Sequence, residues 1–140
     1  MKSEYFIALE QNSNSSPLAL PNVIDQLAFN EQGLIPVITQ DAHTKSVLMF
    51  AWMNKDALEQ TILTQRMTYW SRSRQQLWIK GETSGCWQRL LLMSFDCDGD
   101  AILCEIEQQE AACHTGRKSC FYLQVEVDKQ QVWVTENNEI

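Results

Sequence analysis

Two apolar stretches separated by a short polar one form the first clear pattern along the chain. "LIPVITQ" (34–40) and "SVLMFAW" (46–52) are rich in the β-branched and aromatic residues that favour strands. The five residues between them, "DAHTK", are typical of a turn. The pattern predicts a β-hairpin with a five-residue connection.

The next segment changes to helical spacing. In "NKDALEQTILTQ", Leu58, Ile62 and Leu63 recur at intervals that place them near one face of a helix. Asn54 precedes them, and asparagine is favoured at the position that caps a helix N-terminus. The segment predicts one main helix.

Strand-like stretches dominate the rest of the chain. They are rich in β-branched and aromatic residues and occupy residues 67–71, 75–79, 87–95, 101–107, 121–127 and 131–135. "DKQ" (128–130) predicts a turn between the last two. The expected fold is α+β, a compact and mostly β domain with one main helix. Residues 22–140 are expected to form this single catalytic domain, whereas residues 1–21, which include the polar "QNSNSSP", are expected to be an extension that need not pack tightly.

The composition constrains the environment of the protein. With 140 residues, 44% of them hydrophobic, the chain can bury a core without disulfides. Five cysteines without an export signal favour reduced thiols, which serve as metal ligands, nucleophiles or core residues. No apolar run approaches the length needed to cross a bilayer, so we expect a cytoplasmic protein without a membrane partner.

The charge is unevenly distributed along the chain. A net charge of −7 argues against nucleic acid as a partner, because binding to phosphate backbones depends on clustered Lys and Arg. Residues 66–89 contain five basic residues and one acid, a net +4, whereas the remainder contains six basic and 17 acidic residues, a net −11. This asymmetry predicts a local anion site or, as the alternative, a solvated strand or loop face.

Within the basic segment, "YWSRSRQQLWIKGETSG" interleaves basic side chains with hydroxyls and ends near two glycines. Guanidinium forks, hydroxyls and exposed backbone amides are the groups that bind phosphate. The P-loop pattern is absent. The candidate phosphate-binding residues are Ser71, Arg72, Ser73, Arg74, Lys80, Thr83 and Ser84.

Three aspartates stand two residues apart in "SFDCDGDAILCEI". On an extended strand Asp96, Asp98 and Asp100 would share one side, with Cys97 on the other. Like charges at this spacing favour a bound hard cation, and carboxylates are ligands of Mg²⁺. The alternatives are a solvated acidic turn and a calcium loop of the EF-hand kind, but Ala101 stands where that loop needs glycine.

A second candidate metal site lies in "ACHTGRKSCFY". Cys113 and Cys120 are seven residues apart, His114 follows the first, and the glycine between them allows a tight turn. Thiolate and imidazole ligands suit zinc, although the spacing differs from that of a structural zinc finger. Cys97 could add a third thiolate and leave the fourth position open for water, as in catalytic zinc sites.

The other two cysteines have no such pattern. Cys104 lies in an apolar strand next to Leu103 and Ile102, and all three are expected in the core. Cys86 has no partner at ligand spacing.

Taken together, these stretches resemble the phosphoribosyl-AMP cyclohydrolase family. "GLIPVITQD", "VLMFAWMN", "YWSRSRQQLW", "KGETSG", "DCDGD" and "CHTGRKSCFY" stand in the family's order and spacing from Gly33 to Tyr122. The resemblance implies a monofunctional hydrolase of histidine biosynthesis that opens the N1–C6 bond of 1-(5-phosphoribosyl)-AMP, a phosphorylated nucleotide. It also implies Mg²⁺ on the three aspartates, where the ion aids substrate binding.

The resemblance further implies a homodimer with one zinc ion per subunit. In the family's pattern the zinc ligands correspond to Cys97, Cys113 and Cys120, in a site shared between subunits. The chain departs from many relatives at Ile79, where they have a polar or charged residue, and at Cys86, where they have histidine. We assign neither residue a role.

The chemistry fits the residues independently of the resemblance. A purine alkylated at N1 is cationic, so its C6 is electrophilic and requires a nucleophilic water and a proton shuttle. Zinc-bound water would be the nucleophile. His114 is the candidate shuttle, unless it is a structural hydrogen-bonding residue of its loop, and Glu82 is a second acid/base candidate.

Two other functions compete with this one. A zinc-dependent purine deaminase-like hydrolase would use the same kind of water, but its H-x-E and P-C-x-x-C signature is missing. The non-enzymatic alternative is a structural zinc or metal-storage module, which turnover of phosphoribosyl-AMP would exclude.

Overall fold

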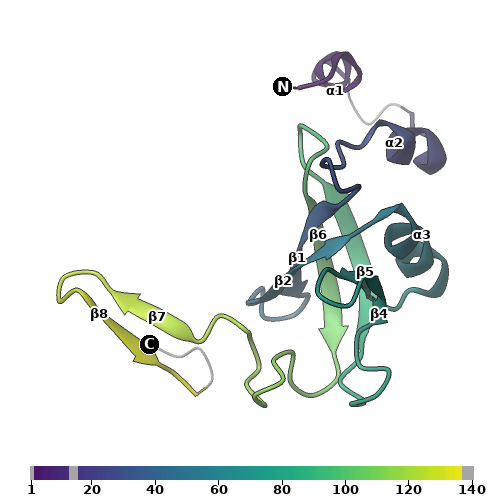
Figure 1. Cartoon of the computed structure of the whole chain (residues 1–140). Coiled ribbons are helices and arrows are strands. Elements are labelled where there is room, and N and C mark those ends of the chain that lie inside the picture. The colour runs from purple at the N-terminus through teal and green to yellow at the C-terminus, as the bar shows by residue number, and fades with distance from the viewer. Residues whose placement is uncertain (1, 13–15, 137–140) are drawn as a thin grey trace.

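A four-stranded sheet forms the centre of the protein in the computed structural model, which describes residues 2–12 and 16–136. Its strand order is β2-β1-β6-β5, and the hairpin of β1 (Ile35–Asp41) and β2 (Val47–Met53) confirms the first sequence prediction. A second antiparallel pair consists of β5 (Gln88–Phe95) and β6 (Ile102–Gln108). The two pairs join through parallel pairing of β1 with β6 (Figure 1).

The predicted main helix is α3 (Lys55–Thr64), which follows β2. Asn54 caps it as expected, because its side-chain oxygen accepts a hydrogen bond of 2.8 Å from the Ala57 amide. Leu58 is buried, but Leu63 is 81% exposed, contrary to its expected place on the buried face. The reason is that α3 presents Ala57, Leu58 and Thr61 to the interior, a face that Leu63 does not share.

The remaining predicted strands are also confirmed, and they complete an α+β fold in which strands predominate. Strands β3 (Thr68–Ser71) and β4 (Gln76–Ile79) pair with each other beside α3. Strands β7 (Leu123–Glu126) and β8 (Gln131–Val134) form a hairpin that projects from the body (Figure 1). Within residues 2–12 and 16–136, no helix combines the length and apolar character that a membrane crossing requires.

The core lies between one face of the large sheet and α3. On β6, Ile102, Cys104 and Ile106 are almost completely buried, as expected for a core cysteine and its neighbour. Burial raises the pKa of the Cys104 thiol to about 12. The prediction that Leu103 is a core residue is wrong: it is 37% exposed, because side chains alternate along a strand.

Leu103 belongs to an apolar row on the opposite face of the sheet, here called the outer face. Ile38 pairs with Phe50 on one side and with Leu103 on the other, so the three residues lie in line across β2, β1 and β6. Their exposed fractions are 37% for Ile38, 49% for Phe50 and 37% for Leu103. The projecting hairpin also exposes apolar residues, among them Val125 and Trp133.

Two short helices, α1 (Glu4–Leu9) and α2 (Leu20–Gln26), precede the sheet. The sequence predicts that residues 1–21 are an extension that need not pack tightly; within it, Phe6 is 6% exposed and belongs to the core. A Cβ atom on Gly99 would overlap the Phe6 ring, so the close contact requires glycine there. The prediction also covered residues 1 and 13–15, which lie outside the described residues.

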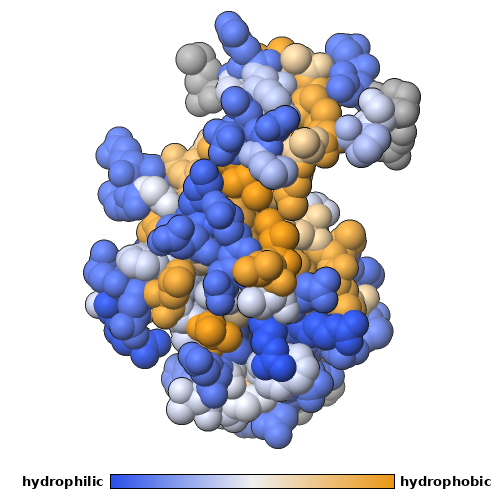
Figure 2. All heavy atoms as spheres, turned by 90° about the vertical axis from the view of Figure 1, so that its right-hand side faces the viewer, coloured by the Kyte–Doolittle hydropathy of each residue, from blue (hydrophilic) through white to orange (hydrophobic). Residues whose placement is uncertain are grey.

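An apolar hollow of about 300 Å³ lies between α2 and α3. Apolar side chains gather on this side of the molecule below the N-terminal helices (Figure 2). They include Leu20, Ile24, Ile62 and Leu63. The exposed Leu63 therefore contributes to a surface groove instead of the core.

A chain of buried polar groups crosses the core. Tyr69 is fully buried, and its hydroxyl lies 2.7 Å from Thr39 Oγ1 and donates to Gln88 Oε1 at 2.7 Å. The Gln88 amide in turn donates to Gln108 Oε1 at 2.8 Å. Because buried polar groups are costly without partners, this network of hydrogen bonds fixes β1, β3, β5 and β6 relative to one another.

Replacing Tyr69 with phenylalanine should lower the free energy of unfolding by about 1–3 kcal/mol, because Thr39 and Gln88 would each lose a buried partner. Urea unfolding followed by circular dichroism measures this change. The matched control is Tyr5→Phe, for which a change within about 0.5 kcal/mol is expected because Tyr5 is only partly buried. Equal effects of the two substitutions would contradict the role of the buried network.

Candidate active site

A cavity of about 1370 Å³ lies between the turn after β4 and the loop after β6. Seven of the predicted site residues line it: Arg74, Lys80, Glu82, Thr83, Ser84, Cys113 and His114. Other lining residues were not among the predicted site residues; they include Thr44, Ser46, Trp78, Cys86 and Glu110. Lys118 also lines the cavity, and its position between two candidate zinc ligands was a signal that could have found it.

The turn after β4 is held close to the start of β5. Gly81 has a φ of +82°, and a Cβ atom there would overlap the backbone of Trp87. The preceding Lys80 is 8% exposed, and its ammonium donates a hydrogen bond of 2.7 Å to the Ala112 carbonyl. The Lys80 ammonium therefore joins the two loops that line the cavity. Its Nζ atom lies 5.4 Å from the centre of the Trp78 ring.

The "SRSR" stretch divides between two cavities. Arg74 lines the large cavity, and its amide donates to Ser71 Oγ, which lies 3.4 Å from Ser73 Oγ. Arg72 instead lines a separate hollow of about 440 Å³ and stands 5.1 Å from the centre of the Trp52 ring. The predicted phosphate-binding residues therefore do not form a single cluster within the chain.

The two thiols of the loop after β6 lie side by side. Cys113 is buried, whereas Cys120 is exposed as a residue although its thiol group is partly enclosed. The loop is anchored on β2, because the Cys120 amide donates to the Leu48 carbonyl at 2.7 Å. Ser119 strengthens this anchor, since its hydroxyl donates to the Val47 carbonyl at 2.8 Å.

The environment separates the pKa values of these two thiols. Burial by itself raises the pKa of Cys113, but hydrogen bonds from Thr115 and Cys120 and the charge of Arg117 outweigh it, so the pKa is lowered overall. Burial and the neighbouring Cys113 raise the pKa of Cys120 to about 11. One thiolate stabilised by a neighbouring thiol is a ligand pair that suits a soft metal ion such as zinc.

His114 and Glu82 are both exposed on the wall of the cavity. His114 follows Cys113 directly and so stands next to the thiol pair, whereas Glu82 belongs to the turn after β4. Both side chains can therefore meet a ligand in the cavity, as a proton-transferring residue must.

The three aspartates do not lie on a strand, which corrects the prediction of alternating faces. They occupy the turn between β5 and β6, where Gly99 has a φ of +68° and its amide donates to the Asp96 carbonyl. Such a turn satisfies its amides locally, and the Asp100 amide donates to Asp96 Oδ1 at 2.9 Å. The opposite-faces explanation for Cys97 is therefore wrong as well.

The turn nevertheless brings carboxyl groups together. Burial by itself raises the pKa of Asp96, but hydrogen bonds from Asp100 and from backbone amides outweigh it and lower the pKa overall. The same side-chain contact, followed by burial, raises the pKa of Asp100. Asp98 faces elsewhere and forms an ion pair of 3.4 Å with Lys2.

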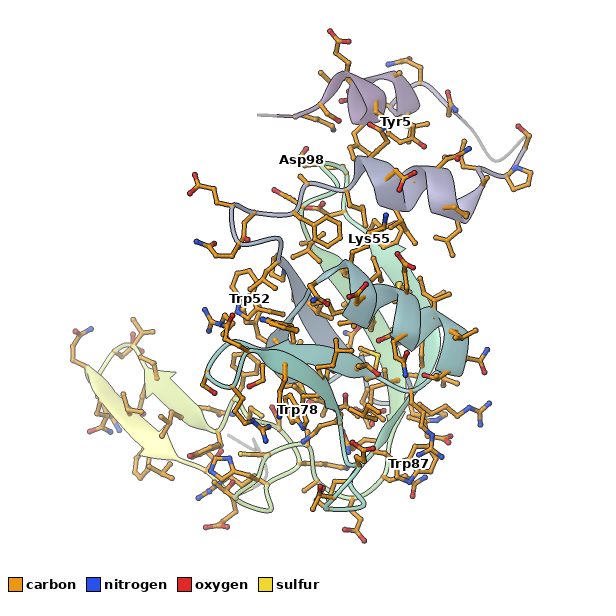
Figure 3. All side chains as sticks on the ribbon, turned by 45° about the vertical axis from the view of Figure 1, so that its right-hand side comes forward. Tyr5, Trp52, Lys55, Trp78, Trp87 and Asp98 are labelled. Atoms are coloured by element: carbon orange, nitrogen blue, oxygen red, sulfur yellow. The ribbon has the colours of Figure 1, made fainter. Side chains whose placement is uncertain are left out.

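Cys97 lies in the aspartate turn and is exposed. Strand β6 separates this turn from the Cys113 loop, and its seven residues span roughly 20 Å. In Figure 3, Asp98 lies near the N-terminal helices, whereas Trp78 lies toward the opposite end of the molecule. Among the residues that the structure describes, no three metal-ligating side chains of this chain meet at one point.

Replacing Thr115 with valine should raise the pKa of Cys113, because the Thr115 hydroxyl donates to Cys113 Sγ at 3.1 Å and favours the thiolate. The measurement is a pH titration of the ultraviolet thiolate absorbance of metal-free protein. The thiolate fraction assigned to Cys113 should persist to lower pH in the parent than in the variant. Thr64→Val, distant on α3, is the control, and identical titrations of all three proteins would refute this account of the thiol pair.

The chain is similar to known proteins over most of its described length. The family model described as phosphoribosyl-AMP cyclohydrolase matches residues 49–122. A protein named phosphoribosyl-AMP cyclohydrolase from Roseobacter denitrificans is 52% identical over 111 residues, covering 79% of this chain and 87% of its own length. A protein of the same name from Chloroherpeton thalassium is 50% identical over 114 residues, covering 81% of this chain and 81% of its own length. Another from Alkalilimnicola ehrlichii is 48% identical over 127 residues, covering 91% of this chain and 89% of its own length. The chain belongs to the phosphoribosyl-AMP cyclohydrolase family.

Proposed function

We propose that the chain hydrolyses the N1–C6 bond of 1-(5-phosphoribosyl)-AMP in histidine biosynthesis. The observation that carries this proposal is the large cavity, which is lined by basic side chains, an exposed histidine and Cys113 of the thiol pair in a chain of this family. In the reaction, the oxygen of water bonds to C6 and the electrons of the N1–C6 bond pass to N1. C6 and its amino group then form the carboxamide of an imidazole product.

The two phosphates of the substrate would explain why basic residues are concentrated in residues 66–89. Arg74, Lys80 and Lys118 line the large cavity and would bind one phosphate there, with the hydroxyls of Thr83 and Ser84 as further donors. Arg72 stands in a different hollow, with a positive charge stacked on a tryptophan. The separation of the two arginines suits a substrate that carries a phosphate at each end.

His114 would move the proton in this reaction. It is exposed in the cavity beside Cys113, so it can take a proton from the attacking water and return one to N1 as the bond breaks. Glu82 is the second acid/base candidate, on the facing turn.

Zinc fits the donors that the chain supplies. Cys113 and Cys120 form an adjacent pair in which one thiolate is favoured, and a strand's length separates them from Cys97. We therefore propose that Cys97 of a second subunit completes the site, with one zinc ion per subunit. When bound, zinc would lower the pKa of a water molecule toward neutrality and so provide the nucleophile.

Mg²⁺ fits the aspartate turn for a different reason. The Asp96 and Asp100 side chains are in contact, and this contact lowers the pKa of Asp96 and raises that of Asp100. A divalent cation bound between them would relieve the repulsion of two carboxylates, with Asp98 of the same turn as the third ligand. In a shared site, this ion would aid substrate binding from the neighbouring subunit.

A homodimer would cover the apolar surfaces of the chain. The row of Ile38, Phe50 and Leu103 on the outer face and the apolar residues of the projecting hairpin are exposed in the single chain. Contiguous exposed apolar surface is typical of protein interfaces. We expect the dimer to be a cytoplasmic enzyme, where the thiols stay reduced.

Purified protein with zinc and Mg²⁺ should convert 1-(5-phosphoribosyl)-AMP to the imidazole product, followed by the new product absorbance. His114→Asn should lower kcat by roughly 10²–10⁴-fold with little change in KM, because it removes a proton-transferring group. Arg74→Ala, at the phosphate-binding wall of the same cavity, should act mainly on KM.

Three outcomes would contradict the proposal. Absence of turnover by zinc-loaded protein would exclude the reaction and leave a structural zinc module, and turnover of adenosine nucleotides with release of ammonia would indicate a deaminase. An equal effect of His114→Asn and Arg74→Ala on KM alone would mean that His114 binds substrate without moving protons.

A further inference from the structure

Glu110 adopts a backbone conformation that its residue type disfavours. It has a φ of +62°, in the left-handed region, and lies in the loop immediately after β6. A side chain with a Cβ atom is strained in this region, and such strain persists where the surrounding structure imposes it. The Glu110 side chain lines the large cavity that also contains Cys113 and His114.

Neighbouring glutamines hold the loop in this conformation. The Gln108 amide nitrogen donates to the Cys86 carbonyl at 3.2 Å and to the Gln109 carbonyl at 2.9 Å, while its oxygen accepts from buried Gln88. The Gln109 backbone amide donates to the Trp87 carbonyl at 3.0 Å. The buried polar network of the core therefore extends to the residue just before Glu110.

The Glu110 carboxylate has a weak partner inside the cavity. Cys86 Sγ donates to Glu110 Oε2 over 3.6 Å, and Cys86 lines the same cavity. Within residues 2–12 and 16–136, no lysine or arginine forms an ion pair with Glu110. Its negative charge is consequently available to a ligand, although basic residues line other parts of the same cavity.

The charges of the cavity match a ligand with two different ends. Arg74, Lys80 and Lys118 attract phosphate, whereas a carboxylate repels it and accepts hydrogen bonds from a cationic base. A purine alkylated at N1 has a positive charge and N–H groups on its six-membered ring. Its ring would therefore point toward Glu110 when a phosphate lies among the basic residues.

We propose that Glu110 binds the cationic ring of the N1-alkylated adenine and so selects it over ordinary adenine nucleotides. This inference rests on the proposed function, because it assigns a specificity-determining residue to the same cavity. Gln108 is a positioning residue, since it acts on the substrate only through the loop that carries Glu110.

The experiment compares two probes, N1-methyl-AMP and AMP, which share a phosphate and differ in the charge of the ring. Every protein in it also has the His114→Asn substitution, which slows the proposed reaction by roughly 10²–10⁴-fold. The dissociation constants of the probes are measured by calorimetry on the zinc-loaded full chain and on Glu110→Gln. The parent should bind N1-methyl-AMP more tightly than AMP. Glu110→Gln should lose roughly 10- to 100-fold in affinity for N1-methyl-AMP, the range for hydrogen bonds to charged groups, and change less than about twofold for AMP.

Two further variants separate ligand binding from loop structure. Glu110→Gly removes the carboxylate but suits a left-handed backbone, so it should lose the same preference while resisting urea at least as well as the parent. Glu107→Gln removes a glutamate three residues away that does not line the cavity, and it should leave both affinities unchanged.

The proposal is overturned if Glu110→Gln weakens both probes equally, because Glu110 would then only maintain the loop. It is also overturned if neither probe changes, because the ring would then bind elsewhere. Because the affinities are measured with the His114→Asn substitution present, they stand apart from turnover. A chain that prefers N1-methyl-AMP but does not open phosphoribosyl-AMP with His114 intact would refute the proposed function and retain the role of Glu110.

Discussion

The parallel pairing of β1 with β6 is the constraint on which the rest of the structure depends. It joins two hairpins into one sheet and makes β6 a central strand, paired along both edges. A strand that is paired along both edges holds the segments at its two ends apart by its full length. The aspartate turn with Cys97 precedes β6, and the loop with Cys113 and Cys120 follows it. Residues that are close in sequence therefore lie at opposite ends of the sheet, and our account of the metal site follows from this separation (Figure 1).

The buried polar network connects this sheet to the cavity. Tyr69 and Gln88 satisfy each other inside the core, and Gln108 carries the same chain of hydrogen bonds outward to the Cys86 carbonyl. A network of this kind is stabilising only when every member is paired. Its last hydrogen bonds therefore hold the loops at its end in place. The turn after β4 gains a second anchor through Lys80 and the Ala112 carbonyl. The cavity wall is thus built on rigid elements, although its residues belong to turns and loops.

Local patterns in the sequence predicted the elements well, because strand alternation, turn residues and the Asn54 cap act within a few residues. Of the predicted site residues, Arg74, Lys80, Cys113 and His114 line one cavity, and their roles there stay predictions. The errors arose where tertiary context decides. The aspartates alternate in sequence but occupy a turn, and Leu103 is apolar but faces outward because its neighbours on either side face the core. Glu110 could not be found, because no sequence pattern marks a glutamate in a left-handed conformation, and Phe6 packs on Gly99 through a contact remote in sequence.

The most direct test of the account asks whether one active site draws on two chains. Cys97→Ser is prepared with one affinity tag and the double variant Cys113→Ser, Cys120→Ser with another. The two are unfolded, mixed and refolded, and heterodimers are isolated through both tags. Each variant alone should be inactive, because neither has a complete thiolate set. The heterodimer should regain one zinc ion and one working site, formed by the intact Cys97 of one chain and the intact Cys113 and Cys120 of the other. Isolated heterodimers with neither zinc nor activity would contradict a shared site.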